Sequence, residues 1–261
     1  MTSRRKSVSI IIPIFNEQDG VGQLKEKLSI LHRLLCDQFD VEFVFVDDGS
    51  SDNTVSVIKK EFTDSPYLFR VLEHGINRGV GDAFRTGFEA AKAAFVCTID
   101  ADCSYSPEGL KKLLEALQST GADIAVASPY HPQGKVEGVP GWRLALSKGC
   151  SLLYRLTSPV KLYTYTSIFR AYRGEVTGNL RFAATGFVAA AEILVEASRK
   201  GYTIVEIPMV LRGRAIGRSK MKIARTILTH FRMLMNVGFS RESAPVPPQL
   251  MGLGEVGLHK N

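Results

Sequence analysis

Hydrophobic residues follow two patterns along the first half of the chain. Short, mainly apolar runs, which are typical of buried strands, occupy residues 8–14, 42–47, 69–73, 95–100 and 124–127. Between these runs the apolar residues recur with a helical period, in residues 20–35, 54–62, 81–93 and 107–117. Strands that alternate with helices predict an α/β fold with a mainly parallel sheet flanked by helices on both faces. Ligands of such sheets bind outside the carboxyl ends of the strands.

The second half of the chain has a longer loop and fewer strands. The Gly and Pro content of residues 129–142 predicts that loop. Helices are expected at 142–156, 187–199 and 222–237, and strands at 163–173 and 202–211. We therefore expect one domain, residues 1–237, with two halves at about 7–128 and 129–237, followed by a flexible Pro- and Gly-rich tail at 238–261.

Acidic motifs follow three of the predicted strands. They are "PIFNE" at 13–17, "VDDGSSDNT" at 46–54 and "DADCSYSPE" at 100–108. Because parallel strands end at the same edge of a sheet, these acids should converge on one crevice. Asp100 and Asp102 point the same way, and two close carboxylates repel each other. A divalent cation such as Mg²⁺ or Mn²⁺ relieves this repulsion and leaves positions for substrate phosphates, whereas the alternative is an exposed acidic turn.

The second acidic motif has both a ligand-binding and a structural interpretation. Asp47 or Asp48 could accept hydrogen bonds from a nucleobase or ribose. Asp52 or Asn53 could instead serve as the cap of the helix that begins at Thr54. Both interpretations fit the position of the motif at a strand end.

Glycines and cations add two further candidate segments. The glycines of "NRGVGDAFRTGF" at 77–88 allow close backbone approach to a ligand, or form an ordinary helix entry, and their spacing is not GxGxxG. The loop "RGRAIGRSK" at 212–220 could neutralise a leaving diphosphate, or could be a solvated basic loop. The helix expected at 222–237 has an apolar stripe, which could lie on an anionic membrane surface or pack against the sheet.

Composition narrows the function classes. The net charge is +7, and residues 199–225 contain eight Lys or Arg residues and one acid, Glu206. Such a region usually meets phosphate. The basic residues lack an aromatic stacking platform, so we expect no nucleic-acid partner. The four cysteines form no CxxC pair, which disfavours zinc and disulfides and favours a cytoplasmic protein. No apolar run of about 18 residues predicts a transmembrane helix.

Taken in chain order, the motifs are specific. "IIPIFNE", "VFVDDGSSDNT", "NRGVGDAFRTGF", "IDADCSYSPE", "YTSIFRAYR" and "EIPMVLRGRAIGRSK" together resemble a family 2 inverting glycosyltransferase with a GT-A fold. More narrowly, residues 7–237 resemble the dolichol-phosphate mannosyltransferase (polyprenyl-phosphate sugar transferase) group. The resemblance implies a nucleotide-sugar half at 7–128 and an acceptor half at 129–237.

The resemblance also implies a role for individual residues. The donor, a GDP- or UDP-sugar, would be bound by Pro13, Phe15, Glu17, Val46, Asp48, Asp100, Ala101, Asp102, Arg214 and Lys220. A Mg²⁺ or Mn²⁺ ion bridging its diphosphate would be held by Asp100, Asp102 and Ser104. The acceptor phosphate would be bound by Arg143 and Ser147. The residues expected to act in catalysis are Asp102, Arg214, Lys220 and Glu192.

Three positions depart from the pattern of the group. Pro129 stands in "SPY" where an Arg is common, and Thr164 and Ile168 replace the Asp and Gly of a "DxTSGFR" motif. Lys135 or Arg170 could supply the missing phosphate contact, and Arg170 is therefore an acceptor-binding candidate. All three departures fall on the acceptor side.

The reaction implied by the resemblance is metal-dependent, inverting transfer of a hexose, mannose or glucose, to a polyprenyl (dolichyl-type) phosphate. A phosphate monoester is largely anionic at neutral pH, since its second pKa is about 6. A hydroxyl acceptor would need a general base, for which Glu192 is the candidate, unless Glu192 only faces a basic neighbour. The alternatives are a transferase with a soluble saccharide or cell-wall acceptor, and an inactive nucleotide-sugar-binding subunit. The sugar, the base and the oligomeric state stay open.

Overall fold

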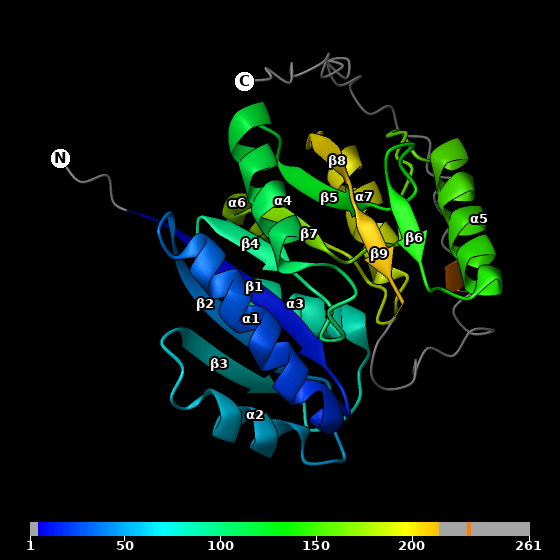
Figure 1. The fold of residues 1–261 in the computed structure, drawn as a ribbon. Helices are drawn as coiled ribbons and strands as arrows, with labels where there is room; N and C mark the ends of the chain where they lie inside the picture. Colours follow the sequence, from blue (N-terminus) through cyan, green and yellow to red (C-terminus); the bar gives the residue numbers. More distant parts are fainter. Residues whose placement is uncertain (1–4, 214–228, 231–261) are drawn as a thin grey trace, which may run out of the picture.

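A seven-stranded sheet forms the centre of the molecule (Figure 1). The computed structural model describes residues 5–213 and 229–230. The strand order is β3-β2-β1-β4-β7-β5-β8. Its strands are β1 (Lys6–Ile14), β2 (Phe39–Asp47), β3 (Leu68–Glu73), β4 (Phe95–Thr98), β5 (Ile124–Ser128), β7 (Arg170–Arg173) and β8 (Ile204–Pro208). A second, two-stranded sheet pairs β6 (Lys135–Glu137) with β9 (Val210–Arg212).

Helices cover both faces of the central sheet, as the sequence predicts. They are α1 (Val21–Leu35), α2 (Thr54–Phe62), α3 (Val80–Ala90), α4 (Pro107–Thr120), α5 (Gly141–Thr157), α6 (Gly174–Asn179) and α7 (Ala189–Arg199), with a short 3₁₀ turn at Gln18–Gly20. Side chains alternate across the strands, so Ile10 and Ile12 join a core with α1 and α4, while Ile11 joins a second core with α3 and α7. The fold is therefore a three-layer α/β arrangement.

One strand of the central sheet runs against its neighbours. β7 is antiparallel to β4 on one side and to β5 on the other, whereas the remaining pairings are parallel. The amino end of β7 therefore lies at the edge where β4 and β5 have their carboxyl ends. The residues that lead into β7 consequently arrive at the ligand-binding edge of the sheet.

Four elements of the second half differ from the sequence prediction. The strand expected at 163–173 is shorter, since only Arg170–Arg173 pairs in the sheet. The strand expected at 202–211 is divided into β8 and β9, and Met209 between them is buried. The loop at 129–142 contains β6, and the short helix α6 carried no signal. These segments respond to tertiary contacts, which override local propensity.

The predicted C-terminal elements lie largely outside the described residues. The basic loop after Gly213, most of the helix expected at 222–237 and the tail at 238–261 belong to that part. Thr229 and His230 are helical, and the hydroxyl of Tyr154 on α5 lies 2.9 Å from His230 Nδ1. Burial lowers the pKa of His230 to about 4. Among the helices that the structure describes, none combines the length and apolar content that crossing a membrane requires.

Candidate active site

The three acidic motifs meet at one edge of the sheet. β1 lies between β2 and β4, and the β1–β2 register places Pro13 beside Val46. On the other side, the backbone amide of Ile99 donates to the carbonyl of Ile11 at 3.1 Å. The strand ends before Asn16, Asp48 and Asp100 are therefore neighbours, as the sequence predicts.

The segment after β4 folds into a tight turn that gathers oxygen atoms. The amide of Cys103 donates to the carbonyl of Asp100 at 3.3 Å, and Cys103 has φ 55°. The amide and hydroxyl of Ser104 donate to Asp102 Oδ1 at 3.0 and 2.6 Å. Burial is the main reason that the pKa of the Cys103 thiol rises to about 12, and the charges of Asp102 and Asp100 add to it. Both carboxylates thus lie near this one turn.

These donors fit a hard divalent cation. Carboxylate and hydroxyl oxygens are ligands that Mg²⁺ and Mn²⁺ accept, and Mg²⁺ typically keeps positions for phosphate oxygens or water. Within the described ranges, no group of three His, Cys, Asp or Glu residues could hold a metal ion on its own. The turn therefore suits an ion that completes its coordination with a substrate diphosphate.

A pocket of about 260 Å³ opens beside this turn. Asp100 and Ser104 line it from the end of β4, and Arg143 and Ser147 line it from α5. The residues leading into β7 form a third wall: Thr164, Thr166, Ser167 and Ile168. The structure thus brings predicted metal ligands and predicted acceptor ligands to one cavity.

Arg143, which lines this pocket, has a donor without a partner in the described chain. Its Nε is buried and has no hydrogen-bond partner among the described residues. Ser147 is held nearby, with its hydroxyl 2.8 Å from that of Thr166. A buried guanidinium donor without a partner is costly, so this wall favours an anionic ligand.

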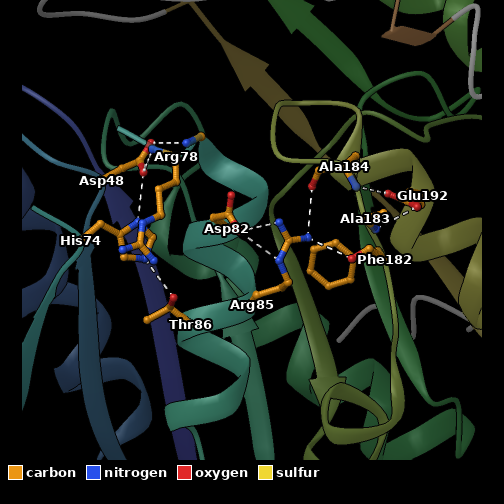
Figure 2. A network of polar contacts seen from close by, with 11 residues as sticks. Asp48, His74, Arg78, Asp82, Arg85, Thr86, Phe182, Ala183, Ala184 and Glu192 are labelled. Carbon is orange, nitrogen blue, oxygen red and sulfur yellow. Dashed lines mark hydrogen bonds and ion pairs between the residues drawn. The ribbon is translucent and has the colours of Figure 1, made fainter. Parts of the chain in front are cut away.

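Asp48 has a different environment from the one predicted. Its carboxylate accepts the backbone amides of Arg78 and Gly79, both at 2.8 Å, and His74 Nδ1 lies 3.0 Å from it. His74 Nε2 in turn lies 2.9 Å from the hydroxyl of Thr86 on α3 (Figure 2). Asp48 therefore holds the loop before α3, and the nucleoside contact predicted for it gains no support. Val46 is fully buried, which leaves only its backbone for such a contact.

The preceding residue, Asp47, keeps one carboxylate oxygen without a partner among the described residues. Its Oδ2 accepts the amides of Gly49 and Ser50 at 3.2 and 3.0 Å. Its Oδ1 is buried and finds no hydrogen-bond donor in the described part of the chain. The sequence named Asp47 only as an equal alternative to Asp48, because both follow the same strand.

Loops after β1 and β2 hold each other in place. Ser51 donates its amide to Asn16 Oδ1 at 2.7 Å, and Glu17 donates its amide to Thr54 Oγ1 at 2.8 Å. Asp52 Oδ1 accepts the amide of Thr54, the first residue of α2, at 3.0 Å, whereas Asn53 at the N-cap position makes no side-chain capping bond in the described structure. Pro13, Phe15 and Glu17 are half-buried along this edge.

A family assignment follows from comparison with known proteins. The profile of the family described as "Glycosyl transferase family 2" matches residues 9–180. The chain belongs to glycosyl transferase family 2.

Two curated relatives of this family 2 chain transfer to polyprenyl carriers by name. A dolichol-phosphate mannosyltransferase of Pyrococcus furiosus is 34% identical over 227 residues, which are 86% of this chain and 62% of that protein. A polyprenol monophosphomannose synthase of Mycolicibacterium smegmatis is 32% identical over 218 residues, or 81% of this chain and 80% of that protein. The chain thus spans less than two thirds of the first relative's length.

Solved structures agree on the fold. Glucosyl-3-phosphoglycerate synthase of Mycobacterium tuberculosis, with Mn²⁺, UDP and glucosyl-3-phosphoglycerate, matches with a TM-score of 0.68 at 20% identity, over 89% of this chain and 80% of that one. The mannosyltransferase PcManGT of Pyrobaculum calidifontis, with GDP-Man and Mn²⁺, has a TM-score of 0.65 at 19% identity, over 93% and 67%. The GT-A fold predicted for this family 2 chain is confirmed.

Two predicted site residues lie outside the pocket. Glu192 Oε1 and Oε2 accept the amides of Ala183 and Ala184 at 3.0 and 2.7 Å (Figure 2), so the base role predicted for Glu192 gains no support. Arg170 is 1% exposed and donates to the carbonyl of Tyr165 at 2.9 Å. It does not line the pocket, and burial in the sheet contradicts its predicted contact with the acceptor.

The glycines before α3 approach the chain itself rather than a ligand. A Cβ on Gly79 would lie 2.3 Å from the carbonyl oxygen of Thr185, and one on Gly81 would lie 2.1 Å from that of Ala184. Gly81 also donates its amide to Thr185 at 2.7 Å. These two glycines therefore join α3 to the segment before α7, and their ligand-binding interpretation gains no support.

Sequence reasoning missed Glu206, which supports the pocket wall. Its carboxylate accepts the Ser128 hydroxyl at 2.7 Å and the amides of Tyr163 and Thr164 at 2.8 and 2.9 Å. Burial raises the pKa of Glu206. The available signal in the sequence was that Glu206 is the one acid in the basic stretch 199–225.

The three residues that depart from the pattern of the group, Pro129, Thr164 and Ile168, all line the pocket. Arg214 and Lys220 fall outside the described residues.

Proposed function

We propose that this family 2 glycosyltransferase moves a hexose from a GDP- or UDP-sugar to a polyprenyl phosphate, with a divalent metal. The observation that carries the proposal is the single pocket shared by the turn at Asp100 and Ser104 and by Arg143 and Ser147. A metal-bound diphosphate at the turn and an acceptor phosphate at α5 would then face each other. The named activities of the curated relatives support this assignment.

The pocket rim favours a lipid over a soluble acceptor. Trp142, Leu146, Phe187 and Leu211 line the pocket together with its polar groups. Trp142 and Phe187 are 49% and 43% exposed. An isoprenoid chain can cover these apolar side chains, whereas a sugar acceptor leaves them in water.

The residues divide the chemistry between them. Asp100, Asp102 and Ser104 would hold Mg²⁺ or Mn²⁺, which stabilises negative charge on the leaving nucleotide diphosphate when bound. Arg143 and Ser147 would hold the acceptor phosphate by charge-assisted hydrogen bonds. Because a phosphate monoester is largely anionic at neutral pH, its oxygen can attack the anomeric carbon without a strong base. Attack opposite the leaving diphosphate inverts the anomeric centre. Arg214 and Lys220 remain predicted partners of the diphosphate.

Donor binding is tested by thermal stabilisation. GDP-mannose, UDP-glucose and UDP-N-acetylglucosamine are each added with and without Mn²⁺, and one of them should raise the melting temperature only with the metal. Asp102→Ala should abolish this metal-dependent rise and lower the transfer rate by about 100-fold or more. Asp64→Ala, at an exposed acid of the same half, is the matched control.

Transfer itself is tested with radiolabelled donor. Label should move to a product that organic solvent extracts when polyprenyl phosphate is present. Label found only in a water-soluble product would assign a soluble acceptor instead. Metal-dependent binding without any turnover would indicate an inactive nucleotide-sugar-binding subunit. If Asp102→Ala keeps the full metal-dependent stabilisation, the metal assignment is wrong.

A further inference from the structure

The segment before α7, residues 182–187, is built like a strand without belonging to a sheet. It is part of no helix or sheet that the structure describes. Exposure alternates along it, with Ala183, Thr185 and Phe187 exposed and the residues between them half-buried. This period of two is typical of a strand, whose backbone groups need partners when they are buried. We call residues 182–187 the pocket arm.

Side chains of α3 and α7 supply the partners that a neighbouring strand would supply. Arg85 Nη1 on α3 donates to the carbonyls of Phe182 and Ala184 at 2.9 and 3.3 Å. Glu192 on α7 accepts the amides of Ala183 and Ala184 at 3.0 and 2.7 Å. Figure 2 shows the pocket arm between these two charged side chains. Two helices therefore hold one short stretch of backbone from two sides.

An acid orients the guanidinium of Arg85. Asp82 lies one turn earlier on α3, and its Oδ1 accepts Arg85 Nε and Nη2 at 3.1 and 2.5 Å. The guanidinium also lies 5.1 Å from the ring centre of Phe182. Because the guanidinium is a rigid fork, bonds to Asp82 on one side fix the direction of Nη1 on the other. Arg85 thus places the backbone of the pocket arm at a defined distance from α3.

Phe187 connects the pocket arm to the pocket. Its ring lines the cavity and is 43% exposed. Since so much of the ring lies in the open, packing holds it weakly, and its place in the wall follows from the backbone that carries it. That backbone is fixed at Ala184, three residues earlier. Arg85 is not among the described residues that line the pocket, so it can act there only through the pocket arm.

We propose that Arg85 is a positioning residue for the acceptor, and this inference rests on the proposed function. By holding the pocket arm, Arg85 sets Phe187 against the apolar chain of the acceptor. The phosphate of the acceptor lies on the other wall, at Arg143 and Ser147. Loss of Arg85 should therefore weaken binding of the apolar chain and leave binding of the phosphate unchanged.

Acceptor binding can be measured without turnover. The chain has a single tryptophan, Trp142, and it lines the pocket. Farnesyl phosphate, a short polyprenyl phosphate, is titrated against the full chain while the fluorescence of Trp142 is recorded. Methyl phosphate, which lacks the apolar chain, is measured by its competition with farnesyl phosphate. Arg85→Met should raise Kd for farnesyl phosphate about tenfold, as expected for a lost aromatic contact, and leave Kd for methyl phosphate unchanged.

A double-mutant cycle tests the route through Phe187. Phe187→Ala alone should raise Kd for farnesyl phosphate about tenfold, and adding Arg85→Met should change it little further, because the ring that Arg85 positions is gone. Additive losses would overturn the positioning role. The matched control is Arg181→Met, since Arg181 is exposed and also donates to two backbone carbonyls, those of Gly178 and Leu180, both at 3.0 Å. The control should bind both phosphates as the unmodified chain does.

Arg85→Lys carries the test if Arg85→Met does not fold. A Lys ammonium can bond to one carbonyl of the pocket arm but cannot keep the fork to Asp82 as well, so Kd for farnesyl phosphate should rise by a smaller factor, about threefold. Equal loss of affinity for farnesyl and methyl phosphate would show a general collapse of the pocket and would overturn the proposal.

Transfer assays separate this inference from the proposed function. Binding losses that are coupled between Arg85 and Phe187, without transfer of sugar to any lipid, would keep the positioning role and reject the proposed transfer to polyprenyl phosphate. Transfer to polyprenyl phosphate with an unchanged KM in Arg85→Met would keep the proposed function and overturn the positioning role. A raised KM with an unchanged kcat in this variant is the expected result, because the pocket arm affects acceptor binding and not the reacting atoms.

Discussion

The two halves of the molecule build their ligand surfaces in different ways. At the edge of β1 and β2, side chains bind the protein's own backbone, and loops after the two strands hold each other through Asn16 and Thr54. At the acceptor side, the pocket is lined by side chains of α5 and of the residues before β7, and one buried donor of Arg143 finds no protein partner in the described chain. The edge at β1 and β2 is thus held mainly by bonds within the protein, with Asp47 Oδ1 as its unpaired exception, whereas the α5 wall consists of side chains that surround an open pocket.

This difference separates two kinds of buried charge. Asp48 was expected to contact the nucleoside and Glu192 to act as a base, but both have their oxygens committed to backbone amides. Arg143, in contrast, has a buried Nε that makes no hydrogen bond to the described residues. Mutations should therefore change stability in the first case and acceptor use in the second.

Among the changes that test this comparison, the largest effect should come from Arg143→Ala. Removing the guanidinium takes away charge-assisted bonds to the acceptor phosphate, so kcat/KM for polyprenyl phosphate should fall about 100-fold. Donor binding and the melting temperature should stay unchanged. Initial rates at varied acceptor and thermal shifts with donor measure the two effects, and Arg33→Ala, at an exposed arginine of α1, is the control. A matching loss of donor binding would remove the distinction between the two sides.

Asp48→Asn should have the next largest effect, on folding. One of the acceptor oxygens becomes an amide group that faces a backbone N–H of Arg78 or Gly79, so the free energy of unfolding should fall by about 2–3 kcal/mol. Urea denaturation measures this change, with the exposed Asp64→Asn as the control. Unchanged stability together with lost donor binding would instead show that Asp48 contacts the nucleoside directly.

The smallest effect should come from Glu206→Gln, which leaves the fold intact but weakens the wall at Thr164. The free energy of unfolding should fall by about 1–2 kcal/mol near neutral pH, because Gln offers one acceptor oxygen where Glu offers two. KM for the acceptor should rise while donor binding is kept.

The pH dependence of that variant has a defined sign. Burial raises the pKa of Glu206 in the folded protein above its ordinary value of 4.5. As pH rises above 4.5, the Glu206 carboxyl loses its proton in the unfolded chain first, because the folded protein keeps this proton to a higher pH. The Glu206 contribution to the free energy of unfolding therefore declines with rising pH in this range. The Gln variant lacks this decline. Urea unfolding from pH 4 upward should show the wild-type advantage shrinking toward neutral pH, and a growing advantage would contradict the raised pKa.

Strands with both faces buried were predictable from sequence. β1 and β2 are buried on both sides of the sheet, so their residues form apolar runs that need no partner to be recognised. Residues 163–173 also carry β-branched and aromatic residues, but Thr164 and Thr166–Ile168 line the pocket, and only Arg170–Arg173 pair in the sheet. β6 and β9 stabilise each other across 75 positions of sequence, which a local pattern cannot contain.

The placement of Asp100 and Ser104 at the carboxyl edge of the sheet was predictable, because both follow a buried strand. The contacts of acids that bind the backbone were not predictable. Four carboxylates each accept two consecutive amides: Asp47 from 49–50, Asp48 from 78–79, Glu192 from 183–184 and Glu206 from 163–164. The sequence shows where an acid is but not which backbone amides it binds, because every residue except proline has such an amide.

The reversed strand β7 has a consequence for synthesis of the chain. β4 pairs with β1 on one side and with β7 on the other, and β7 leaves the ribosome some seventy residues later. Until then, Phe95–Thr98 presents an unpaired, apolar strand edge beside β1. A fragment that stops before Arg170 would leave this edge of β4 unpaired and should aggregate. Only when Arg170–Arg173 pairs with β4 is this edge protected from other chains.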